Sequence, residues 1–140
     1  MVKRRRGSRT AHRRVAAGRD RFERLVERAL DGIPAPFRAA LEEVAIVIED
    51  EATPDQLDVA DVDEADPEDV LYGLYEGTPR TEWGADAVPF PNRISLFRIP
   101  LEEDFPDPDD LAEEVRITVV HELAHHLGID DDRLEELGLD

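Results

Sequence analysis

The sequence predicts an α+β fold in a single domain of 140 residues. Three stretches support this class: an amphipathic helical pattern that starts at Asp20, a β-branched run at 44–50, and a long apolar helix that ends near Leu127. The helical stretches repeat apolar residues at three- and four-residue steps, whereas the β-branched run has the length of a strand. Such elements suit one modest core, so we expect residues 20–140 to form the folded domain.

The first helix is expected to begin at Asp20, whose side chain can cap it, and to end at Gly32. A second, short helix, PFRAALEE, leads into the strand VAIVIED at 44–50. This strand is apolar almost throughout, which is typical of a strand covered on both faces. Residues 51–69 carry nine acids and no base and predict an exposed loop.

Beyond this loop, residues 71–84 read LYGLYEGTPRTEWG and hold both tyrosines and the only tryptophan. The stretch NRISLFRIP at 92–100 alternates apolar and polar residues as a strand does, and the prolines around it favour an edge or short strand over a central one. The last helix is expected to have Asp107 as its cap, Pro108 at its first position and Gly128 just past its end.

The charge is divided unevenly along the chain. Residues 1–19 carry eight bases and no acid, which leaves 9 bases and 35 acids, a net charge of −26, on residues 20–140. The aperiodic basic segment predicts a disordered tail that could contact nucleic acid weakly. The acidic domain argues against nucleic acid as its own partner and favours cationic peptides.

The composition also bears on the location of the protein. No run approaches the roughly 20 apolar residues that a membrane span needs, and the basic start leads into no apolar secretory segment. The chain has no cysteine, which excludes disulfides and zinc sites made of thiolates. We therefore expect a cytoplasmic protein with no membrane partner.

The stretch HELAHHLGIDD at 121–131 predicts a metal site. On a helix, His125 falls about 40° from His121 and one turn along, so both imidazoles can reach one ion. Apolar residues fill most of the rest of this helix, which indicates a buried helix with one polar stripe. Gly128 lets the backbone reverse, so that Asp131 can become the third ligand and leave the fourth position to water, as in catalytic zinc sites.

Glu122 lies beside this ligand pair and is the candidate general base. The ion would lower the pKa of its water to about 7, and Glu122 would take the proton of that water and pass it to the leaving nitrogen. His126 points to the apolar side and is expected to be a core or supporting histidine. Histidine–carboxylate sites also accept manganese, iron, cobalt and nickel, so zinc is the first of several candidate ions.

At these residues the chain resembles the zincin metallopeptidases, and more closely a family of small bacterial zincin-like metallopeptidases. The resemblance covers roughly residues 20–137 and is most specific at HELAHHLGIDD, where the family has an aspartate that matches Asp131. It implies a minimal zincin-like fold, in which a small mixed sheet packs on helices and the C-terminal metal-binding helix is buried. It also implies zinc as cofactor, His121, His125 and Asp131 as ligands, Glu122 as base, and a peptide or protein as substrate.

The chain departs from metzincins because its only methionine is Met1, so the methionine turn beneath the metal is absent and a shallow site is implied. Zincins hold an extended peptide along an edge strand beside the metal helix. The candidates for this role are Arg93, Ile94, Ser95, Leu96, Phe97, Arg98 and Ile99. Tyr72 or Tyr75 is a candidate donor to the oxyanion, and the alternative is that these rings only pack beneath the glycine turn.

Three functions remain open from the sequence. The first is a zinc-dependent peptidase, the second a binding module that uses the metal only for stability, and the third a metal-dependent RNA hydrolase. Glu122 favours the first, because peptide hydrolysis needs a base, and the acidic domain disfavours the third.

Overall fold

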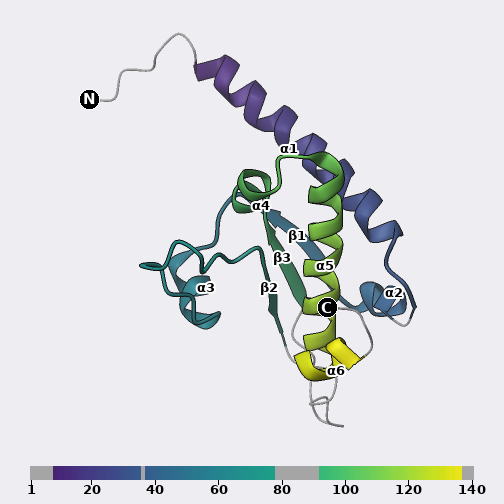
Figure 1. The fold of residues 1–140 in the computed structure, drawn as a ribbon. Helices are drawn as coiled ribbons and strands as arrows, with labels where there is room; N and C mark the ends of the chain where they lie inside the picture. Colours follow the sequence, from purple (N-terminus) through teal and green to yellow (C-terminus); the bar gives the residue numbers. More distant parts are fainter. Residues whose placement is uncertain (1–7, 36, 78–91, 137–140) are drawn as a thin grey trace.

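The computed structural model describes residues 8–35, 37–77 and 92–136, except for the side chains of residues 8–17 and 131. It confirms the predicted α+β class (Figure 1). In chain order the elements are α1 (Ser8–Asp31), α2 (Phe37–Ala40), a 3-10 turn (Leu41–Glu43), β1 (Ala45–Glu49), α3 (Pro54–Val59), β2 (Gly73–Glu76), β3 (Arg93–Phe97), α4 (Arg98–Asp104), α5 (Pro108–Leu127) and α6 (Asp131–Glu136).

The sheet is mixed, with the strand order β1-β3-β2. β3 pairs with β1 in parallel, with Ala45 opposite Arg93, and with β2 in antiparallel fashion, with Tyr75 opposite Ile94. Side chains alternate between the two faces of a sheet, so Tyr75 shares the face of Ile94 and Leu96. Both of these β3 residues are fully buried in the core, and this is the face against which α5 packs.

Helix α5 is the centre of the fold. It packs against α1 on one side and against β2 and β3 on another (Figure 1). Val115, Val119, Val120 and Leu123 of this helix have no exposed surface. Burial of each such side chain is worth roughly 1.5–3 kcal/mol relative to exposure. Apolar residues around most of the helix circumference therefore have packing partners on more than one side.

Both ends of α5 are capped as predicted. The Asp107 carboxylate accepts hydrogen bonds from the backbone N–H groups of Asp109 and Asp110, at 2.8 and 3.3 Å. At the other end Gly128 has a φ of 74°, which favours glycine. The Ile129 N–H then donates to the Ala124 carbonyl at 2.8 Å, so the chain reverses direction immediately after the histidines.

The N-terminal helix is longer than predicted. It begins at Ser8 and not at Asp20, so residues 8–19 are helical, and the expectation that Asp20 caps the helix is wrong. Residues 1–7 of the predicted tail lie outside the described part of the chain. The end of the helix at Asp31, just before Gly32, agrees with the sequence.

The predicted loop at 51–69 contains a helix. Thr53 and Gln56 form a capping box for α3, in which each side chain bonds to the other residue's backbone N–H. This capping box satisfies two backbone amide groups at the start of the helix. The prediction of a loop missed it, because that prediction rested on the acidic composition of the segment. Within residues 8–35, 37–77 and 92–136, no helix has both the length and the apolar character needed to cross a membrane.

Two predictions about the strands are also wrong. β1 lies at an edge of the sheet and is half-buried, not covered on both faces. The strand predicted to be an edge or short strand, β3, is short, with 5 residues, but it is central in the sheet and ends at Phe97. Arg98 and Ile99 belong to α4, where Pro100 is tolerated because the first-turn amides have no helical partner.

Candidate metal centre

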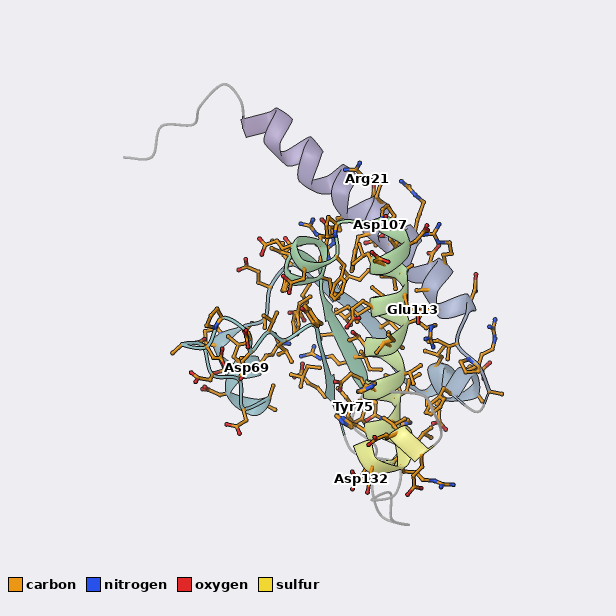
Figure 2. The ribbon with its side chains drawn as sticks, in the orientation of Figure 1. Arg21, Asp69, Tyr75, Asp107, Glu113 and Asp132 are labelled. Carbon is orange, nitrogen blue, oxygen red and sulfur yellow. The ribbon has the colours of Figure 1, made fainter. Side chains whose placement is uncertain are left out.

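His121, Glu122 and His125 lie on the last two turns of α5, as the sequence predicts. The side chain of His125 is 50% exposed and that of Glu122 14% exposed. Figure 2 shows Tyr75 of β2 at this end of α5, near Asp132 of α6, whereas Arg21 and Asp107 lie at the opposite end. The predicted base and the two predicted ligands therefore lie where α5, β2 and α6 approach one another.

The His121 ring has a buried nitrogen without a partner. Its Nε2 atom is inaccessible to solvent and makes no hydrogen bond with any described residue. A buried polar atom left in this state costs about 1–3 kcal/mol, and a metal ion would satisfy it. Two turns before His121 on α5, burial raises the pKa of Glu114, and the charge of His121 opposes that rise. The donor chemistry at His121 fits a zinc ion.

Glu122 is held in place by a strand that is distant in sequence. Its Oε2 atom accepts a hydrogen bond of 2.9 Å from the backbone N–H of Tyr75, and the same oxygen lies 3.2 Å from Nδ1 of His125. β2 can approach this closely because residue 73 is glycine: a Cβ there would lie 2.6 Å from Cγ2 of Thr118, one turn before Glu122. Sequence analysis missed Gly73, although a glycine within a strand often marks a close approach.

His126 supports this arrangement from inside the core. Its side chain is fully buried, with Nδ1 3.0 Å from the Tyr75 hydroxyl and Nε2 2.8 Å from a Glu43 carboxylate oxygen. A carboxylate only accepts hydrogen bonds, so Nε2 carries the proton. The Tyr75 hydroxyl also lies 3.0 Å from Oδ1 of Asn92. The prediction that His126 is a core histidine is confirmed, and the same contacts join the 3-10 turn, α5, β2 and the residue that precedes β3.

Asp131 is the first residue of α6. It follows the turn at Gly128, as expected, but its side chain lies outside the described part of the structure. Among the side chains that are described, no three histidine, aspartate or glutamate groups gather closely enough to hold an ion. The assignment of Asp131 as third ligand stays a prediction.

Comparison with known protein families matches residues 41–139 to the zincin-like metallopeptidase family. The chain is a member of this family. The matched range begins at Leu41 and includes the last turns of α5, and it leaves out α1. No curated protein matches the chain. Membership supports a hydrolase of the metallopeptidase class, with a peptide or protein substrate and a zinc ion, at the level of the family.

In this zincin-like metallopeptidase the predicted substrate strand cannot serve as an edge. Both sides of β3 are paired, by β1 and by β2, and its residues Ile94 to Phe97 are fully buried. The sequence suggested an edge because prolines occur on both sides of this stretch, but β3 itself, Arg93–Phe97, contains no proline. Within the described residues β2 is paired on one side only, so the edge beside α5 is Gly73–Glu76.

The two tyrosines have different surroundings in the zincin-like metallopeptidase. The Tyr72 hydroxyl donates to Asp104, and its ring meets Phe105 edge-on, at the junction of α4 and α5. Burial and this hydrogen bond raise the pKa of Tyr72 to about 12. The structure does not bring Tyr72 to the histidines. Tyr75 lies beside the candidate base, because its backbone N–H donates to Glu122. Its hydroxyl, however, contacts the core histidine His126 and Asn92.

Proposed function

We propose that the protein is a zinc-dependent peptidase that hydrolyses peptide bonds with Glu122 as general base. The observation that carries this proposal is the buried Nε2 of His121, which has no hydrogen-bond partner among the described residues. It lies one helical turn from His125 and next to a carboxylate. His121, His125 and Asp131 would hold the ion. When bound, zinc polarises the substrate carbonyl and lowers the pKa of a water molecule.

Glu122 supplies proton transfer in this proposal. Water attacks the carbonyl carbon of the scissile bond, and Glu122 accepts the proton that this water loses. The carboxylate then delivers that proton to the leaving nitrogen as the C–N bond breaks. The hydrogen bond from the Tyr75 N–H to Oε2 fixes the orientation of the carboxylate and leaves its other oxygen, Oε1, as the candidate for contact with the water.

The edge of β2 that no described residue pairs with is the proposed binding surface for the substrate. The Tyr75 N–H donates to Glu122 and not to β3, so it faces away from the sheet partner. An extended peptide that adds to this edge by backbone hydrogen bonds therefore passes next to the base. This replaces β3 as the candidate substrate strand and keeps the mode of binding that the sequence suggested.

The decisive experiment compares wild type with Glu122→Gln. We expect the variant to retain zinc, measured by metal analysis, and to hydrolyse a labelled denatured protein about 10²–10⁴-fold more slowly, because it lacks the base. His125→Ala should lose zinc as well as activity.

Two results would favour the other functions. If wild type turns over no peptide in a library while zinc still raises its melting temperature, the protein is a metal-stabilised binding module. If the purified protein degrades RNA and His121→Ala does not, the site is that of an RNA hydrolase.

A further inference from the structure

A second surface feature lies at the end of α5 that is remote from the histidines. It is a groove of about 660 Å³ between α1 and the turn that joins α4 to α5, near the positions of Arg21 and Asp107 in Figure 2. Its apolar floor consists of Phe22, Leu25, Phe105 and Leu111 together with Pro106 and Pro108. None of these residues takes part in the candidate metal centre.

Arg21, Arg24 and Arg28 line the α1 side of this groove. Steps of three and four residues put them on one stripe of the helix, roughly 10 Å long. All three are exposed. Glu102 also lines the groove, but its carboxylate already pairs with Arg98 at 3.4 Å.

The lack of partners for these three arginines is unusual in so acidic a chain. Within the described side chains none of them forms an ion pair or hydrogen bond. Every other described arginine contacts a carboxylate or a backbone carbonyl: Arg19, Arg38, Arg93, Arg98, Arg116 and Arg133. The chain has 35 acids for 17 bases, so unpaired guanidinium groups beside an apolar floor indicate a surface that accepts acids from outside.

We propose that this groove binds an acidic amphipathic helix of another protein. Apolar side chains of the partner would fill the floor, and its carboxylates, spaced at three and four residues, would meet the arginine stripe. The head group of a small amphiphile could reach only part of a stripe of this length. Arg21, Arg24 and Arg28 span two turns of α1, so only a partner helix of at least two turns can contact all three.

The test uses a designed helical peptide of about 20 residues, with leucine on one face and glutamate at the flanking positions. We expect fluorescence anisotropy to show binding to wild type and about tenfold weaker binding to the triple variant Arg21→Gln, Arg24→Gln, Arg28→Gln, because three charge-assisted contacts are lost. Hydrogen exchange should slow at residues 18–28 and 105–111 when the peptide is bound.

The control is a second triple variant, Arg38→Gln, Arg116→Gln, Arg133→Gln, which loses the same net charge away from the groove and should bind the peptide as wild type does. Equal weakening in both variants would overturn the proposal, because net charge alone would then explain binding. A matching peptide with lysine in place of glutamate should leave hydrogen exchange at residues 18–28 and 105–111 unchanged, even if it binds to the acidic surface elsewhere. If dodecanoate protects the groove from exchange and the acidic peptide does not, the ligand is a small amphiphile and the proposal is wrong.

Discussion

Tyr75 joins the candidate base to the core through two separate polar groups. Its backbone N–H donates to Glu122, and its hydroxyl contacts the buried His126 and Asn92. His126 in turn contacts Glu43. Tyr75 is held both at its backbone N–H and at its hydroxyl. These contacts restrict the position of β2 relative to α5, and therefore the position of the Glu122 carboxylate.

We expect Tyr75→Phe to lower the free energy of unfolding by about 1–3 kcal/mol, because the buried contacts of its hydroxyl are lost while the backbone bond to Glu122 remains. Urea unfolding measures this effect. Tyr72→Phe is the matched control, since it removes a hydroxyl that contacts the exposed Asp104, and should cost at most about 1 kcal/mol. Equal losses of unfolding free energy in the two variants would show that the Tyr75 hydroxyl stabilises the fold no more than an exposed hydroxyl does.

Tyr72 gives a prediction for alkaline pH. Burial, and then the hydrogen bond to Asp104, raise the pKa of Tyr72 from 10.0 to about 12. The folded state therefore keeps this proton where the unfolded state loses it, so the contribution to stability is complete below pH 10.0 and is lost as the pH rises towards 12. In Tyr75→Phe, where Tyr72 is the only tyrosine, phenolate absorbance should titrate near 12. Asp104→Asn should lower that midpoint, and an unchanged midpoint would contradict the assigned role of the carboxylate.

At the scale of elements, the close approach of β2 to α5 builds the site. A Cβ at Gly73 would meet Thr118 of α5, and the backbone N–H of Tyr75 donates to Glu122 of α5. These two α5 residues are one helical turn apart, so the strand and the helix are matched over the length of the site. The absence of a side chain at Gly73 is what permits this distance.

Gly73→Ala should therefore destabilise the protein by about 1–3 kcal/mol and move β2 away from Glu122. The added Cβ would lie 2.6 Å from Thr118 Cγ2 and 3.2 Å from the Ser95 carbonyl oxygen. Thr118→Ser removes the first of these contacts, so the double variant should recover part of the loss. Urea denaturation of the four proteins measures this coupling, and strict additivity would argue against the contact.

At the scale of the whole molecule, charge repulsion opposes the compact state. Residues 20–140 carry a net charge of −26, and most ion pairs among the described residues are exposed. Each exposed ion pair of this kind contributes little to the free energy of unfolding. Repulsion among the remaining carboxylates should therefore outweigh them.

Added sodium chloride should accordingly raise the melting temperature at pH 7 by a few degrees, because salt screens exposed charges. Near the isoelectric point of about 4.5 the same addition should have little effect. Calorimetry at both pH values tests this. A fall in melting temperature with salt at pH 7 would mean that the ion pairs dominate.

The sequence by itself determined α5 and the spacing of its functional groups. The caps at Asp107 and Gly128, the apolar circumference and the placement of His121 and His125 one turn apart all depend on residues close together in the chain. The tertiary structure decided which strand is the edge, that β3 is central, and that Tyr75, His126 and Glu43 support the base. These contacts join segments up to 83 residues apart, and no local pattern encodes strand order, because that order depends on how whole elements pack around α5.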